Sequence, residues 1–238
     1  MVGRDFGFKF DGQTIYSLVL EHTTDPPPAL DEEFLVFVMG PYTAFDATYA
    51  FDDAEELESP YVSDPLFDPE SHIGDDGRAS YESALADYCL DLREAYGVRA
   101  FLATDVGIPT ATQAGPREPS KSVLDQSVAF AAVSDAVVFV FSHAGLTTGV
   151  GSEFGAILGE FHLRSGNREP IRKPRERFRV FRTSDSTSAS IGETPDTYEV
   201  DVLEFETRGE LLTKSQQFLV NLERDDPDRN LRVFNPPG

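Results

Sequence analysis

Three short apolar runs constrain the fold of this chain more than any other feature. They span residues 34–39, 98–104 and 136–141, and the first and third read Phe-Leu-Val-Phe-Val-Met and Ala-Val-Val-Phe-Val-Phe. Neither of these two runs alternates apolar with polar residues, which is typical of strands buried on both faces of a parallel sheet. Such a sheet must be covered by helices on both sides, so the runs predict an α/β fold.

The segments between the runs have the spacing of amphipathic helices. Apolar residues recur at helical intervals over residues 78–96, which Gly97 ends, and over residues 152–163, while residues 120–133 form a further predicted helix. Two more strands are predicted at residues 178–182 and 198–205, a helix at 210–222 and a last short strand at 231–234. With right-handed crossovers, this order predicts a doubly wound, mainly parallel five-stranded sheet of the flavodoxin-like type.

The ends of the chain extend this core. Residues 6–20 carry aromatic and β-branched residues around Asp11-Gly12 and predict a hairpin, which three consecutive prolines at 26–28 separate from the rest. We therefore expect an arm or hairpin over residues 1–30 and one α/β domain over 31–238, with a strand-helix addition at the C-terminal end. Residues 42–76 predict a long loop with a helical turn near 54–57.

The charge of the chain indicates its solvent more than its partner. There are 42 acidic and 20 basic residues, a net charge of −22, and only four of the basic residues are Lys. An acid-rich, Lys-poor surface suits molar salt and predicts an extreme halophile of the haloarchaeal type. Salt at about 1 M shortens the Debye length to about 3 Å, so the charge has little reach.

Composition also bears on location and on several classes of site. The acidic surface disfavours general binding to nucleic acid. No run of about 18 apolar residues and no basic-apolar leader is seen, so a cytoplasmic protein without a membrane span is expected. The single Cys89 excludes an internal disulfide and a Cys-based zinc site. The four His residues show no ligand spacing, so neither a metal nor a cofactor is predicted.

One segment departs from the acidic pattern. Residues 164–182 hold eight basic and two acidic residues. The preferred interpretation is an internal counter-surface for the acidic N-terminal third. A phosphate-bearing or nucleic-acid partner that binds at high salt is the alternative, and a homo-oligomer is left open.

Ligand-contacting residues are expected where the predicted strands end. In open α/β sheets, ligands bind at the carboxyl ends of the strands, where the chain reverses its winding direction. Gly40-Pro41-Tyr42 follows the first strand, Asp105 the second, and a Gly-rich segment from 142 to Glu153 the third. Glycines let the backbone approach a ligand, and a helix start favours a negative charge. The predicted ligand contacts are Gly40, Pro41, Asp105, Ser142, Thr148, Gly149 and Gly151.

These residues resemble a known superfamily over about residues 34–163. The Gly-Pro-Tyr after the first strand, Ser134-Asp135 before the third, and Gly151-Ser-Glu153-Phe-Gly at the next helix are similar to the nucleoside 2-deoxyribosyltransferases and their TIR-like relatives. The resemblance implies that Glu153 attacks the sugar C1′ and that the Tyr42 hydroxyl orients it. It implies cleavage or transfer at the N-glycosidic bond of a nucleoside or a nucleotide such as NAD.

The chain departs from the family pattern in the residues that would protonate the leaving base. An acid expected shortly before the nucleophile is replaced by Thr147 or Thr148, and a second is replaced by Ser127, with Asp125 nearby. The alternative is therefore a non-catalytic module of the same fold that binds a nucleotide-like ligand in a regulatory or defence setting.

The candidate residues also have structural interpretations. Glu153 could be a carboxylate in the first turn that stabilises its helix, Tyr42 could pack at the sheet edge, and Asp105 and Asp135 could form turns. A phosphate contact of the loop at 145–151 stays open, although it has neither the Lys nor the spacing of a nucleotide-triphosphate loop.

Overall fold

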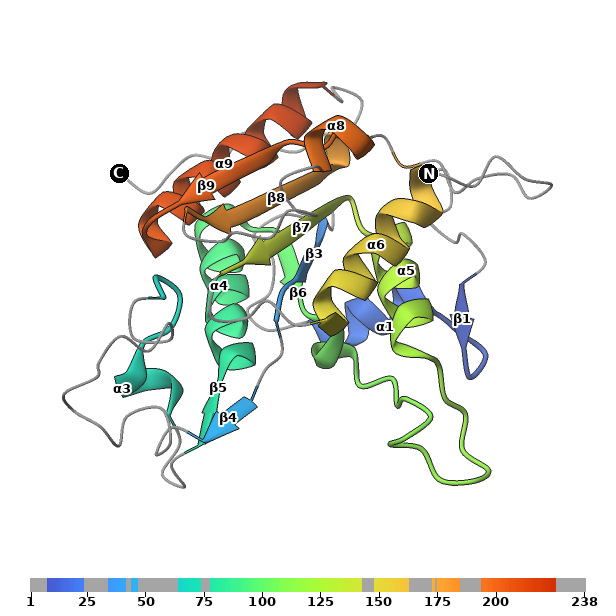
Figure 1. Cartoon of the computed structure of the whole chain (residues 1–238). Helices are drawn as coiled ribbons and strands as arrows, with labels where there is room; N and C mark the ends of the chain where they lie inside the picture. The colour runs from blue at the N-terminus through green and yellow to red at the C-terminus, as the bar shows by residue number, and fades with distance from the viewer. Residues whose placement is uncertain are drawn as a thin grey trace.

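A computed structural model describes residues 8–23, 34–41, 44–46, 64–73, 78–142, 148–162, 173, 175–184 and 194–225. Its centre is a five-stranded sheet in the order β6-β3-β7-β8-β9 (Figure 1). The strands are β3 (Leu35–Met39), β6 (Arg99–Phe101), β7 (Ala136–Phe141), β8 (Phe178–Thr183) and β9 (Val202–Phe205). Every neighbouring pair is parallel. This is the doubly wound, flavodoxin-like sheet that the apolar runs predicted.

Helices cover both faces of the sheet. On one face lie α4 (Tyr81–Tyr96) and α9 (Arg208–Asp225), and on the other lie α1 (Ile15–His22), α5 (Val123–Val133) and α6 (Thr148–His162) (Figure 1). Successive side chains of β7 alternate between the faces: Val138 and Val140 pack with α4, whereas Phe139 and Phe141 pack with α5 and α6. All six residues of β7 are buried. Burial on both sides is the reason why the run shows no alternation in sequence.

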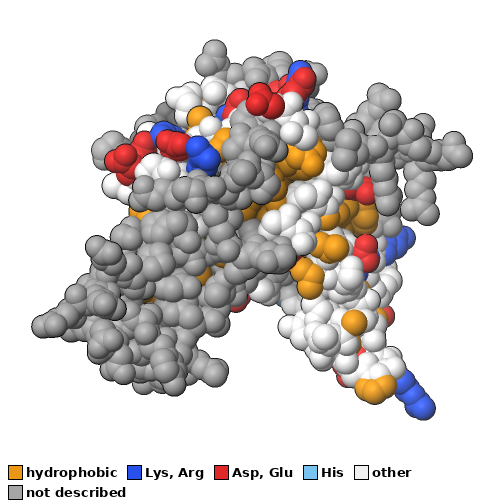
Figure 2. Space-filling view, viewed as in Figure 1, with side chains coloured by type: hydrophobic (Ala, Val, Ile, Leu, Met, Phe, Trp, Pro, Cys, Tyr) orange, Lys and Arg blue, Asp and Glu red, His pale blue; other side chains and the backbone are white. Residues whose placement is uncertain are grey.

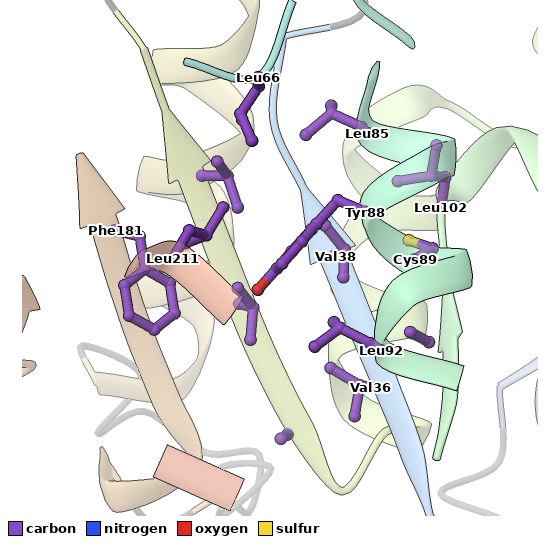
Figure 3. Packing of buried hydrophobic residues seen from close by; sticks show 14 of the residues in the cluster. Val36, Val38, Leu66, Leu85, Tyr88, Cys89, Leu92, Leu102, Phe181 and Leu211 are labelled. Atoms are coloured by element: carbon purple, nitrogen blue, oxygen red, sulfur yellow. The ribbon is translucent and has the colours of Figure 1, made fainter. Parts of the chain in front are cut away.

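The core on the α4 face is centred on Tyr88. Its ring lies between α4 and the strands, among Val38, Leu92 and Leu211 (Figure 3). Its hydroxyl is 2.5 Å from the Ser215 hydroxyl of α9, which itself donates to the Leu211 carbonyl. A buried hydroxyl is therefore satisfied inside an otherwise apolar layer.

The N-terminal segment differs from the prediction. Only β1 (Lys9–Phe10) and β2 (Gln13–Thr14) form a hairpin, and Asp11 and Gly12 turn it with positive φ angles. Thr14 then caps α1 by accepting from the Ser17 N–H, and α1 buries Ile15 and Val19 completely. The aromatic and β-branched residues of 15–20 therefore serve a helix face, which their mixed periodicity did not reveal.

Smaller elements surround the core. They are β4 (Ala44–Asp46), which pairs antiparallel with β5 (Arg78–Ser80), α3 (Pro69–His72), the 3-10 turns η1 (Ala103–Val106) and η2 (Arg175–Arg177), and α8 (Thr194–Tyr198). The helix predicted to start at residue 78 thus begins at 81, after β5. The turn predicted near 54–57 and the strand predicted at 231–234 lie outside the described residues.

Candidate functional site

Glu153 lies on α6 at the side of the sheet that α5 also covers. The helix begins at Thr148, so Glu153 is in its second turn and no acidic residue lies in the first. The prediction of a first-turn carboxylate was therefore wrong, because the helix starts four residues before the expected Ser152. Its free N–H groups lie one turn away from Glu153, which weakens the purely helix-stabilising interpretation.

The Glu153 side chain lines a pocket of about 500 Å³. The pocket lies between α6, the start of α5 and the connection that follows η1, which extends below α5 in Figure 1. Its other described lining residues are Ala103, Thr104, Gly107, Ile108, Pro109, Thr110, Gln113, Val123 and Gln126. Its volume falls in the range of small-molecule sites, and its walls combine apolar, amide and hydroxyl groups, as such sites usually do.

Gln126 holds the pocket wall in place. Its side-chain amide donates to the Ile108 carbonyl at 3.2 Å and to the Lys121 carbonyl at 2.9 Å. Gln126 is buried, and α5 starts beside it with Ser122 as its cap. The connection over residues 107–121 is thus fastened to α5 at two points.

Ser127 fixes one oxygen of the Glu153 carboxylate. The Ser127 hydroxyl donates to Glu153 Oε2 at 2.7 Å, and the Val123 carbonyl lies 3.0 Å from the same hydroxyl as an alternative acceptor. When Glu153 is protonated, its carboxyl group can donate a hydrogen bond to the Ser127 hydroxyl, and that hydroxyl then donates its own hydrogen bond to the Val123 carbonyl. Oε1 has no hydrogen-bond partner among the described residues. The carboxylate is therefore oriented in both protonation states with one oxygen free.

Burial sets the acidity of Glu153. Its side chain is about half buried, and desolvation raises its pKa above the ordinary value of 4.5, while the Ser127 hydrogen bond lowers it in part. A carboxylate with a raised pKa is a stronger base and nucleophile when it is ionised. A half-buried carboxylate with a raised pKa that lines a pocket is a candidate functional residue.

The residues predicted to contact a ligand at the ends of β3 and β7 are buried in the packing of the sheet and its helices. Gly40 and Pro41 are buried, and a Cβ at Gly40 would lie 2.8 Å from Leu85 Cδ1 and 2.9 Å from the Val140 carbonyl oxygen. Gly40 therefore permits the close approach of α4 and β7. Ser142 is completely buried directly after β7. Tyr42 lies outside the described residues, so its role beside Glu153 stays a prediction.

Thr148, Gly149 and Gly151 are part of α6 and not of a loop. A Cβ at Gly151 would meet nothing within 4 Å. The described part of the Gly-rich segment is therefore helical, and a ligand contact of these three residues stays a prediction.

Asp105 serves the local backbone. Its Oδ2 accepts from the Leu102 N–H at 2.9 Å and from Arg93 Nη2 at 3.4 Å. Asp105 closes the η1 turn in this way, as one of its two interpretations expected. Thr104 and Gly107, its near neighbours, line the pocket, and Asp105 is not among the described lining residues.

The described part of the Arg-rich segment is neutralised by acids near the C-terminal end. Arg179 pairs with Asp201, Arg182 with Glu204 at 2.7 Å, and Arg175 with Glu199. Basic and acidic side chains alternate over this part of the surface in Figure 2. The described part of the segment is therefore a counter-surface for residues 199–204. Arg164, Arg168 and Arg172 lie outside the described residues, so for them the expected counter-surface to the acidic N-terminal third stays a prediction.

Within the described ranges, no cluster of three or more His, Cys, Asp or Glu side chains could hold a metal ion. Among the same residues, no helix has both the length and the apolar character needed to cross a bilayer. The wall residues at 103–113 and Gln126 were not predicted, although the Gly and Pro content of the connection marked it as irregular.

Comparison with known proteins places the chain in one family. No curated protein and no solved structure matched it. The match is to the family model described as Domain of unknown function (DUF7509), and it spans residues 21–235. It therefore covers the sheet, the Glu153 pocket and most of the helices. The chain belongs to the DUF7509 family.

Proposed function

We propose that this protein cleaves or transfers the N-glycosidic bond of a nucleoside or nucleotide, with Glu153 as nucleophile. The observation that supports this most is the half-buried Glu153 carboxylate, which Ser127 orients at 2.7 Å in a pocket of about 500 Å³. A pocket of this size accommodates a nucleoside. The resemblance at Gly151-Ser-Glu153-Phe-Gly points to the same residue.

The chemistry follows from one free carboxylate oxygen. Glu153 Oε1 attacks the sugar C1′, the bond from C1′ to the base nitrogen breaks, and the base leaves with the electron pair and takes a proton from water. Water or a second base then attacks C1′, and the Glu153 ester bond breaks. The raised pKa of Glu153 favours the attack, and the Ser127 hydrogen bond holds the carboxylate in position.

A second candidate function is binding without cleavage. One observation favours it: Glu153 is the only ionisable residue among the described lining residues, so no side chain described there can protonate the base. In this alternative the pocket senses a nucleotide-like ligand in a regulatory or defence setting.

The cytoplasmic location and the halophilic source remain part of the proposal, so assays belong in molar KCl.

Base release separates the two functions. Purified protein is incubated with deoxynucleosides, nucleoside monophosphates and NAD, and free base is measured by chromatography. We expect release by the wild type and a loss of about hundredfold or more in Glu153→Gln. Glu160→Gln is the matched control, because Glu160 lies on the same helix outside the described pocket lining. No release from any substrate, together with ligand binding, would favour the binding function.

A further inference from the structure

A second group of polar side chains is buried on the α4 face of the sheet. Asp64, Tyr81 and Ser142 are 3%, 0% and 0% exposed, and we call them the switch-point cluster. Tyr81 is the first residue of α4, and Ser142 directly follows β7. Residues of β7 with even numbers face α4, so Ser142 continues toward that side. The cluster is thus separate from the Glu153 pocket, which lies beside α5.

One half of the cluster is fully hydrogen-bonded. The Tyr81 hydroxyl donates to Asp64 Oδ1 at 2.9 Å, and the Leu66 N–H donates to the same oxygen at 3.0 Å. Burial, with the Asp64 charge added, raises the pKa of Tyr81. The Ser142 hydroxyl lies near the Tyr81 hydroxyl and lowers that pKa in part, but the two groups do not have the geometry of a hydrogen bond. Tyr81 therefore stays neutral, and its hydroxyl proton is used in the hydrogen bond to Asp64.

The other half of the cluster has no partner. Asp64 Oδ2 and Ser142 Oγ are shielded from solvent and have no hydrogen bond within the described part of the chain. Proteins rarely leave buried polar atoms unpaired, because each loses its hydration without compensation. A buried carboxylate oxygen and a buried hydroxyl that both lie near Tyr81 therefore call for a binding partner.

The location of the cluster points to a ligand. In the order β6-β3-β7-β8-β9, the chain reverses its winding direction between β3 and β7. Ligands of open α/β sheets bind at the carboxyl ends of the strands at this point. Ser142 and the start of α4 both lie at this end. The unpaired atoms are therefore placed where such a sheet binds its ligand.

We propose that the switch-point cluster binds the hydroxyl groups of a sugar. Asp64 Oδ2 can only accept a hydrogen bond when it is ionised, whereas Ser142 has a proton to donate. A hydroxyl group both donates and accepts, so sugar hydroxyls satisfy both atoms. An ammonium group would leave the Ser142 proton without an acceptor. Because neither atom reaches solvent, binding includes a local opening at this end of the sheet.

The choice of a nucleoside as the sugar-bearing ligand rests on the proposed function, but the binding site does not depend on catalysis by Glu153. The test therefore measures binding. Adenosine is the probe and adenine is its sugar-free counterpart, and both are titrated by calorimetry in molar KCl. Ser142→Ala is expected to bind adenosine about tenfold more weakly, as for one lost hydrogen bond, with binding of adenine unchanged.

Thermal unfolding adds a readout that a structural role would not produce. Removing an unpaired buried hydroxyl is expected to leave Tm unchanged or raise it. Ser134→Ala is the matched control: Ser134 lies two residues before β7, and its buried hydroxyl donates to the Phe130 carbonyl at 2.7 Å. This control should lower Tm and leave adenosine binding unchanged. Lower affinity without lower stability is the signature of a ligand site.

Each other result overturns the inference. Wild-type affinity in Ser142→Ala would mean that only ordered water satisfies the hydroxyl. A Tm drop like that of Ser134→Ala would assign Ser142 to the structure. Asp64→Asn, which keeps the shape of the side chain, must also weaken adenosine binding. If the wild type releases base but Ser142→Ala binds adenosine as tightly as the wild type, this inference fails alone. If adenosine does not bind to the wild type, this inference is overturned whatever the base-release assay shows.

Discussion

The two ends of strand β7 differ in whether their buried polar groups have hydrogen-bond partners. At the amino end, the Ser134 hydroxyl donates to the Phe130 carbonyl, and the Ser134 carbonyl accepts from Lys173. The Asp135 side chain accepts from the Leu35 N–H at 2.9 Å, and the Asp135 carbonyl accepts from Arg177 at 3.3 Å. At the carboxyl end, Ser142 Oγ has no partner among the described residues. Both ends are buried, so exposure does not explain the difference.

We interpret the difference as one between polar groups that stabilise the fold and polar groups of the proposed sites. A buried group stabilises the fold only when its hydrogen bonds are made, and the amino end meets this condition. The unpaired atoms of the switch-point cluster at the carboxyl end and the half-buried Glu153 cost stability, which a protein tolerates where a ligand compensates. The carboxyl end is therefore where the proposed chemistry and binding belong. Substitutions at the two ends should have different consequences.

The largest expected effect is at the amino end. Asp135→Ala removes the acceptor of the buried Leu35 N–H and should lower the free energy of unfolding by about 2–3 kcal/mol. Denaturant unfolding in molar KCl measures it. Asp135→Asn keeps an acceptor oxygen and should lose less. Equal loss in both variants would show that the charge, and not the Leu35 hydrogen bond, holds this end.

Two glycines of the carboxyl end should respond in opposite directions. Gly40→Ala places a Cβ against Leu85 and the Val140 carbonyl and should cost about 1–3 kcal/mol of stability. Gly151→Ala lies in open space within α6 and should gain about 0.5–1 kcal/mol. Both values come from denaturant titration. A gain for Gly151→Ala with loss of ligand binding would assign Gly151 to the site after all.

The smallest expected effect concerns Glu153 and pH. Burial raises the folded pKa of Glu153 above 4.5, so the folded state binds the proton more tightly than the unfolded state. The resulting stability is present below pH 4.5 and is lost as pH rises through the folded pKa. Near neutral pH, Glu153→Gln should match or exceed the wild type, on the order of 0.5 kcal/mol.

Unfolding curves of both proteins between pH 4 and 8 measure this difference. The advantage of Glu153→Gln should shrink as pH falls. A variant that is less stable at neutral pH would show that Glu153 belongs with the structural groups of the amino end. Base release by the wild type should fall in the same acidic range, because attack needs the ionised carboxylate.

Much of the fold was predictable from local pattern. The run at 136–141 is β7 with the predicted bounds, and the stripe of Tyr81, Leu85, Tyr88 and Leu92 is the buried face of α4. These signals are strong because a strand buried on two faces is a continuous apolar run, and a helix buried on one face repeats its apolar residues at helical spacing. The helix α1 left a weaker record, since eight residues make only two turns.

The candidate site was predictable only in part. Glu153 stood out through its Gly-flanked motif, but its Ser127 partner is 26 residues away and Gln126 carries no motif. The start of α6 at Thr148 was missed because two glycines in its first turns argued against a helix.

The sequence by itself determined the parallel sheet and the alternation of strands and helices, and it predicted the edge of the sheet at which the candidate site residues lie. Only the tertiary structure decided which polar groups are satisfied, because a hydrogen-bond partner is a neighbour in space. Ser134 and Ser142 flank the same strand and are the same residue type, yet one donates to Phe130 and the other has no partner in the described chain. The packing around each end of the strand decides whether a serine finds a hydrogen-bond partner, and it therefore decides which groups stabilise the fold and which belong to the proposed site.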